Sequence, residues 1–143
     1  MSVDRFIDTN VFIYHIDDSD EQKHVIATSI IRTALETGNA CISYQVVQEC
    51  LNAGLRKASV PLDHTRAVIY LSTVLVPLWS VMPSQRLFER GLEIQIRYRF
   101  SFYDSLIVAA ALEVGCKTLL SEDLHHGQQI EGLAIENPFN ASR

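Results

Sequence analysis

The sequence predicts an α/β fold in which helices cover both faces of a mostly parallel sheet. Three observations support this prediction. Short apolar segments alternate with longer segments of helical periodicity. The six glycines and four prolines stand singly and punctuate these segments. The 143 residues, 48% hydrophobic and 20% charged, suit one compact domain spanning residues 1–143.

Each expected strand is short and rich in apolar or β-branched residues. The first strand ends at the polar turn of Asp8, Thr9 and Asn10. The expected strands are 3–7, 40–43, 78–81 and 118–120, with a further edge strand at 133–135. Because strands separated by helices run parallel in one sheet, a mostly parallel sheet follows.

The expected helices show apolar residues at helical spacing and recognisable end signals. Gly38 and Gly115 are placed as C-caps, and Pro77 is placed to stop a helix. The expected helices begin with a short one at 11–15 and continue with 20–38, 45–57, 63–75, 85–97 and 104–114.

Charge and composition exclude several classes of protein. The net charge of −5 argues against nonspecific electrostatic binding to nucleic acid or anionic lipid. It does not argue against a nuclease whose metal ions bring positive charge to the substrate. No apolar run approaches the roughly 18 residues of a membrane span, and the first residues do not form a signal peptide. Three unclustered cysteines indicate buried thiols in a reducing compartment. We therefore expect a cytoplasmic protein without a membrane partner.

Four acidic residues stand where an α/β fold places its ligands, beyond the carboxyl ends of the strands. Asp8 follows the first strand, and Asp123 follows the strand at 118–120. Asp104 begins the apolar helix that leads into that strand, and Glu49 shares an inward helical stripe with Val46. An inward carboxylate needs a partner, and no Lys or Arg occupies that stripe before Arg56 and Lys57.

Convergence of these four carboxylates predicts a cation site. Two carboxylates about 4 Å apart repel by roughly 4 kcal/mol at an effective dielectric of 20. Oxygen ligands without His or Cys suit Mg²⁺ or Mn²⁺. The alternative is structural: Asp8 and Asp104 serve as helix caps, and Asp123 is a solvated loop residue.

At these residues the chain resembles PIN-domain proteins, and most closely the VapC-type toxin ribonucleases of type II toxin–antitoxin pairs. The matching segments are FIDTN at 6–10, QEC at 48–50, YDSLIVAAA at 103–111, LLSEDL at 119–124 and NPF at 137–139. They span nearly the whole chain in the order typical of the family. The resemblance implies a PIN-like three-layer α/β/α fold with a central sheet of four to five strands.

The resemblance also implies roles and partners. Asp8, Glu49, Asp104 and Asp123 match the acidic quartet that holds one or two Mg²⁺ or Mn²⁺ ions for endonucleolytic RNA hydrolysis. Asn10 and Ser121 match supporting polar positions, and Glu122 is left open as a partner or substitute for Asp123. The implied partners are an RNA substrate, a small cognate antitoxin whose tail covers the acidic groove, and a second copy in a homodimer.

Four arginines form a second candidate site, as a basic and aromatic segment for RNA binding, with a solvated helix face as the alternative. They are Arg86, Arg90, Arg97 and Arg99.

Two other functions stay open. One is an aspartate-based phosphatase with Asp8 as nucleophile, although such enzymes need a second Asp where Asn10 stands. The other is a non-catalytic PIN-like module whose acids receive a partner's basic tail.

Overall fold

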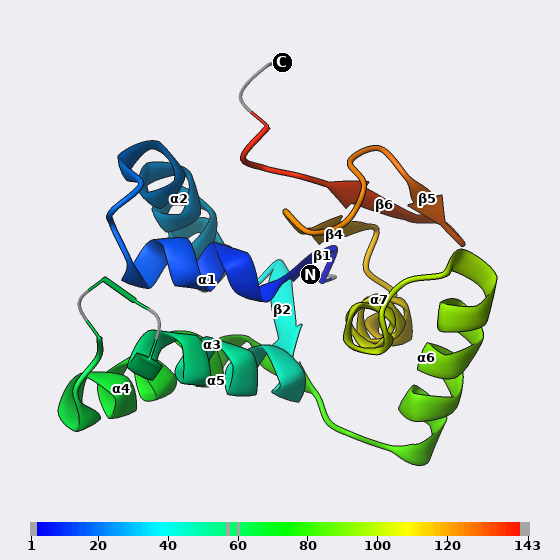
Figure 1. Cartoon of the computed structure of the whole chain (residues 1–143), viewed down its shortest axis with the longest axis horizontal. Helices are drawn as coiled ribbons and strands as arrows, with labels where there is room; N and C mark the ends of the chain where they lie inside the picture. The colour runs from blue at the N-terminus through cyan, green and yellow to red at the C-terminus, as the bar shows by residue number, and fades with distance from the viewer. Residues whose placement is uncertain (1–2, 57, 60, 141–143) are drawn as a thin grey trace.

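The computed structural model describes residues 3–56, 58–59 and 61–140, in which short strands alternate with helices (Figure 1). The strands are β1 (Arg5–Ile7), β2 (Ala40–Ser43), β3 (Trp79–Val81), β4 (Thr118–Leu120), β5 (Gln129–Ile130) and β6 (Leu133–Glu136). The helices are α1 (Thr9–Ile16), α2 (Glu21–Thr37), α3 (Tyr44–Arg56), α4 (His64–Tyr70), the π-helical turn η1 (Leu71–Leu75), α5 (Val76–Leu78), α6 (Gln85–Tyr98) and α7 (Phe102–Val114).

The strands form one sheet in the order β3-β2-β1-β4-β6-β5. All pairings are parallel except that of β5 with β6. Phe6, Leu119 and Ile135 are in register on one face, while Ile7 and Leu120 are in register on the other. All five side chains are buried, so both faces of the central strands are covered. This confirms the predicted mostly parallel α/β sheet.

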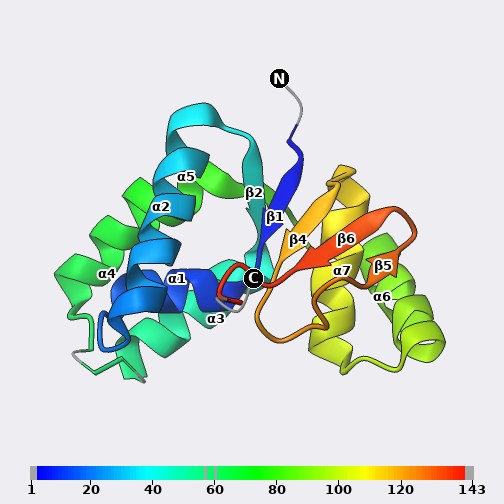
Figure 2. The ribbon, with the colours of Figure 1, turned by 90° about the horizontal axis from the view of Figure 1, so that it is seen from above.

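The two faces of the sheet are covered by helices from different parts of the chain (Figures 1 and 2). Helix α7 packs against β2, β3 and β4, and α6 packs on the outside of α7. Helix α2 lies on the other side, where it contacts α1 and β2. Within the described residues, every helix is too short or too polar to span a membrane.

The capping signals fix several boundaries as predicted. The Asp20 side chain accepts the backbone N–H of Lys23 at the start of α2. Gly38 ends α2 and Gly115 ends α7 with φ of 71° and 83°. These left-handed conformations cost glycine no steric strain. The boundary residue Lys57, expected to close α3, lies outside the described residues.

The sheet has six strands, so the expectation of four to five was wrong. The additional strand, β5, holds only two residues and is too short to show alternation. It pairs with β6 across a two-residue turn at Glu131 and Gly132, whose φ values of 51° and 90° are both positive. This conformation matches a tight type I′ hairpin turn, for which glycine in the second position is the usual signal.

Several helix ends differ from the prediction, among them those expected at Pro77 and Asp104. Pro77 does not stop the helix that begins at His64, because helical structure continues to Leu78. The π-helical turn before it, with the Val76 N–H bonded to the Leu71 carbonyl, widens the helix ahead of the proline ring. Helix α7 begins at Phe102 rather than at Asp104, because the Ser101 side chain caps it by accepting the N–H of Asp104.

Candidate active site

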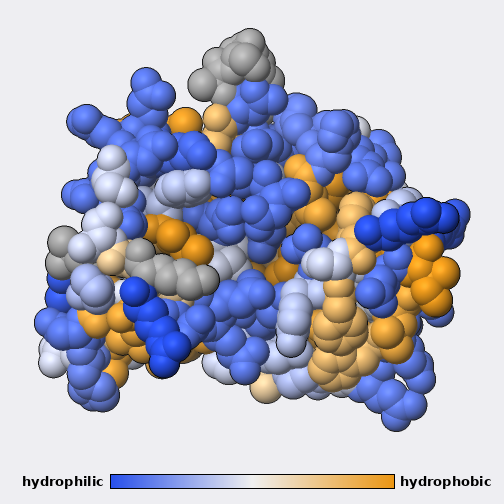
Figure 3. Space-filling view, in the orientation of Figure 1, coloured by the Kyte–Doolittle hydropathy of each residue, from blue (hydrophilic) through white to orange (hydrophobic). Residues whose placement is uncertain are grey.

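The four acidic residues singled out from the sequence line one pocket, named here the acidic pocket, of about 290 Å³. It lies between the first turns of α1 and α7, the middle of α3 and the loop after β4. The surface over the middle of the molecule is mainly hydrophilic, with hydrophobic patches toward its sides (Figure 3). The residues lining the pocket are Asp8, Thr9, Asn10, Ile13, Glu49, Asn52, Ala53, Asp104, Ile107 and Asp123.

Asp8 is the most enclosed of the four carboxylates, with 4% of its surface exposed. It caps α1 by accepting the N–H of Thr9 at 2.7 Å, and its other oxygen accepts the Ser121 hydroxyl at 2.8 Å. Burial raises the pKa of Asp8 to about 7; the Ser121 and Thr9 hydrogen bonds oppose this rise, and the charges of Asp123 and Glu49 add to it. Among the described residues that line the pocket, no lysine or arginine lies beside this buried carboxylate.

Glu49 faces the pocket from α3 and is half-buried. Its Oε1 accepts the Thr9 hydroxyl at 2.6 Å, and its Oε2 accepts the side-chain amide of Gln45 at 3.2 Å. The Gln45 amide also donates to the Tyr103 carbonyl at 3.1 Å, which ties α3 to α7. The sequence reasoning missed Thr9 and Gln45; the spacing of four between Gln45 and Glu49 was the available signal.

Asp104 and Asp123 complete the acidic wall. Asp104 stands in the first turn of α7, where the helix dipole favours a negative charge. Burial raises the pKa of Asp104; its contact with Ser101 opposes this rise, and the charges of Asp123 and Glu49 add to it. Asp123 is exposed, and its carboxylate accepts the Asn10 side-chain amide at 3.1 Å.

The supporting residues Asn10 and Ser121 both contact the acidic residues. Ser121 is fully buried and bridges Asp8 and the N–H of Asp123, which it accepts at 3.2 Å. The side chain of Glu122 points to other partners than that of its neighbour Asp123. It does not line the acidic pocket but binds Lys23 and the Tyr14 hydroxyl.

The donor set of the acidic pocket fits a hard divalent cation. It offers four carboxylates and the Asn10 side chain, and no Lys or Arg is among the described residues that line it. Within residues 3–56, 58–59 and 61–140, no three His, Cys, Asp or Glu side chains already have the spacing of a metal site. Of the four carboxylates, that of Glu49 is oriented by two protein donors, the Thr9 hydroxyl and the Gln45 amide.

The four arginines lie elsewhere, on α6 and at its end. Arg86 and Arg90 line the arginine pocket, which has a volume of about 480 Å³ and is completed by Ala109, Leu112, Glu113 and Glu131. Arg90 pairs with Glu131 and, at 3.0 Å, with Glu93. Arg97 lies over the Tyr98 ring, and Arg99 is the left-handed cap of α6. None of them lines the acidic pocket, so their RNA-binding role stays a prediction.

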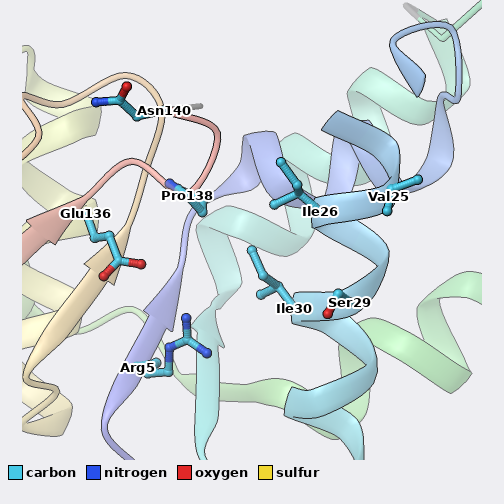
Figure 4. A pocket seen from close by; sticks show the side chains of 8 residues that line it. All are labelled: Arg5, Val25, Ile26, Ser29, Ile30, Glu136, Pro138 and Asn140. Carbon is cyan, nitrogen blue, oxygen red and sulfur yellow. The ribbon is translucent and has the colours of Figure 1, made fainter. Parts of the chain in front are cut away.

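A further groove of about 520 Å³ lies between α2 and the sheet (Figure 4). Val25, Ile26 and Ile30 of α2 form an apolar wall, and Arg5 and Glu136 face it from the strands. With a single carboxylate and a guanidinium among its lining residues, this groove lacks the donor set of a divalent-cation site.

Comparison with known proteins agrees with this architecture. A family model for the PIN domain matches residues 5–128. The chain belongs to the PIN-domain family. A search of curated proteins finds no match.

Solved structures share the PIN fold with this chain. The VapC20 toxin of Mycobacterium tuberculosis, described as cleaving the sarcin-ricin loop, is 22% identical with a TM-score of 0.62, over 83% of this chain and 89% of that one. A DNA-bound VapBC of Salmonella typhimurium is 20% identical with a TM-score of 0.67, over 95% and 98%. FitAcB of Neisseria gonorrhoeae is 17% identical with a TM-score of 0.61, over 95% and 99%. At these identities the likeness concerns the fold.

Proposed function

We propose that this PIN-domain chain is a Mg²⁺- or Mn²⁺-dependent endoribonuclease and the toxin of a type II toxin–antitoxin pair. One observation carries the proposal: four carboxylates from four separate segments line a single pocket, and none of the described residues that line it is a lysine or arginine. Such a like-charged group is costly unless a cation from outside occupies it. The fold shared with the VapC20 toxin supports the choice of RNA as substrate.

The side chains of the pocket have two roles, holding metal ions and positioning the carboxylates that hold them. Asp8, Glu49, Asp104 and Asp123 would hold one or two divalent ions. Bound ions of this kind lower the pKa of a water molecule and offset the charge that develops on phosphate oxygens. The protein fixes the carboxylates that receive them: Ser121 holds Asp8 and Thr9 holds Glu49.

The sequence disfavours the aspartate-based phosphatase, in which Asp8 would be the nucleophile. The Asp two residues later that such enzymes use is Asn10 here.

The proposed partners follow from the same family. Solved relatives include a VapBC2 of Rickettsia felis bound to a promoter DNA fragment and a toxin–antitoxin complex of Klebsiella pneumoniae. We accordingly propose a small antitoxin as the physiological partner and a homodimer as the working assembly, in the cytoplasm.

The decisive experiment measures RNA cleavage by purified protein with EDTA, Mg²⁺ or Mn²⁺, using wild type and Asp104→Asn. Cleavage should require the metal. Asp104→Asn should lower the rate by at least roughly 100-fold, more than loss of an outer-shell partner usually costs. Asp18→Asn, an exposed change of the same kind, is the matched control.

Two results would contradict the proposal. One is cleavage that persists in EDTA, or that Asp104→Asn leaves unchanged in a folded protein. The other is tight binding of a basic peptide tail with no cleavage under any metal condition, which would favour the non-catalytic module.

A further inference from the structure

A charged cluster outside the acidic pocket, named here the Lys23 cluster, joins three separate segments. Lys23 of α2 donates from Nζ to Glu122 Oε2 at 2.5 Å and to the Tyr14 hydroxyl at 3.1 Å. The Tyr14 hydroxyl in turn donates to Glu122 Oε1 at 2.6 Å. The cluster consists of Lys23, Tyr14 and Glu122, and it connects α1 and α2 to the loop after β4.

Aromatic rings partly cover this cluster. Lys23 Nζ lies 4.8 Å from the centre of the Tyr14 ring and 5.9 Å from that of Phe139. The two rings pack edge to face at 4.9 Å. The side chains of Lys23 and Glu122 are 32% and 21% exposed. An ion pair sheltered in this way is stronger and better fixed than a fully exposed one.

Glu122 is held through both of its carboxylate oxygens. Its Oε2 accepts Lys23 of α2 and its Oε1 accepts the Tyr14 hydroxyl of α1, so two helices fix this side chain.

The loop after β4 is attached by three consecutive residues in three directions. Ser121 binds Asp8, Glu122 binds Lys23, and Asp123 accepts the amide of Asn10. The Asn10 amide also approaches Glu122 Oε1 at 3.4 Å, so it lies between the two neighbouring acids. With Glu122 drawn toward α2, Asp123 is the acid left on the pocket side.

This attachment opposes an electrostatic force on the loop. Asp123 lines the acidic pocket together with the carboxylates of Asp8, Glu49 and Asp104, and like charges repel. An exposed loop carrying such a charge lowers its energy by moving away from the pocket. The pair of Glu122 with Lys23 holds the adjacent residue against that movement.

We propose that Lys23 is a positioning residue that, through Glu122, keeps Asp123 at the acidic pocket. The inference rests on the proposed metal-dependent nuclease, because it gives Asp123 a ligand's task. Lys23 itself does not line the acidic pocket and touches neither metal nor RNA in this proposal. It acts on the loop alone.

The first test uses the metal-free protein, so it does not depend on the nuclease activity. Amide hydrogen exchange is compared between wild type and Lys23→Met, with Lys117→Met, an exposed lysine before β4, as the matched control. Exchange at residues 121–125, including the Asp123 N–H bound to Ser121, should become roughly tenfold faster in Lys23→Met, as loss of one charge-assisted hydrogen bond predicts. Exchange in β1 and β4 should stay unchanged.

The second test measures Mn²⁺ binding by titration calorimetry and RNA cleavage by steady-state kinetics. Lys23→Met should weaken Mn²⁺ binding by about tenfold and lower kcat with little change in KM, and Lys23→Arg should restore most of both. Glu122→Gln, which keeps the side-chain size, should reproduce the effect if Lys23→Met is poorly folded.

The outcomes separate the two proposals. A folded Lys23→Met protein with wild-type exchange at 121–125 and wild-type Mn²⁺ affinity would overturn the positioning role. Wild-type protein that binds no Mn²⁺ would instead overturn the nuclease proposal, while the exchange result would still decide whether Lys23 fixes the loop.

Discussion

The acidic pocket and the arginine pocket both hold charged side chains, but they balance their charges differently. The arginine pocket is lined by side chains of both signs, and Arg90 pairs with Glu131 and Glu93. In the acidic pocket four carboxylates face one another, and Asp8 carries a raised pKa. The charge of Arg90 is thus balanced by side chains of the chain itself. In the proposed function the acidic pocket takes its positive charge from a bound ion, so charge imbalance rather than charge density marks the candidate site.

The largest effect that would sharpen this comparison is on stability. The folded-state pKa of Asp8 is about 7 against 3.8 for the ordinary group, so between these values the folded form binds more protons than the unfolded form. The contribution of Asp8 to the free energy of unfolding of metal-free protein should therefore be largest below about pH 4. This contribution should fall by up to roughly 4 kcal/mol as the pH rises through 7.

Asp8→Asn should remove most of that pH dependence and make the metal-free protein more stable at pH 8. The neutral amide keeps the shape of the side chain and can still accept the N–H of Thr9. Urea unfolding at pH 4, 6 and 8 without divalent ions measures the effect. Equal pH slopes for wild type and variant would show that Asp8 bears no unbalanced charge.

A divalent ion should offset the negative charge of the acidic pocket and should not act at the arginine pocket. Mn²⁺ at about 100 times its dissociation constant should stabilise wild type by roughly 2.7 kcal/mol. The gain should be larger at pH 8 than at pH 5, because protons compete for the carboxylates. Thermal unfolding with and without Mn²⁺ measures it. Arg90→Met should retain the gain and Asp8→Asn should lose it; equal gains in both variants would place the ion elsewhere.

The smallest effect concerns the arginine pocket. Arg90→Met should cost at most about 1 kcal/mol of stability, because the Arg90 side chain is 35% exposed and such pairs contribute little. The difference from wild type should shrink in high salt. RNA cleavage should stay within about twofold of wild type. A loss of cleavage beyond tenfold would instead support the phosphate-binding role predicted for α6.

The sequence predicted those features that follow from the type of a residue and its place in a strand or helix. Asp8 and Asp123 follow strands, and Glu49 lies on an otherwise apolar stripe with Val46 and Cys50, so their shared pocket follows from parallel-strand geometry. The cap at Gly38 followed from its residue type in the same way.

The rest depends on contacts between distant segments. Glu122 and Lys23 are 99 positions apart, so nothing local distinguished Glu122 from its neighbour Asp123. Arg90 and Glu131 are likewise 41 positions apart, so local sequence did not reveal that Arg90 is paired. Pro77 misled the prediction because the π-helical turn before it is not visible in residue type.

The two ends of the sheet determine how other chains can approach it. The outer strands are β5, with two residues, and β3, with three, and a strand this short offers a foreign backbone very few amide and carbonyl groups. A visiting polypeptide therefore gains little by extending the sheet at either end. We therefore expect partners to bind through side chains and helix surfaces. Edge-to-edge association of the sheets of two copies is disfavoured for the same reason.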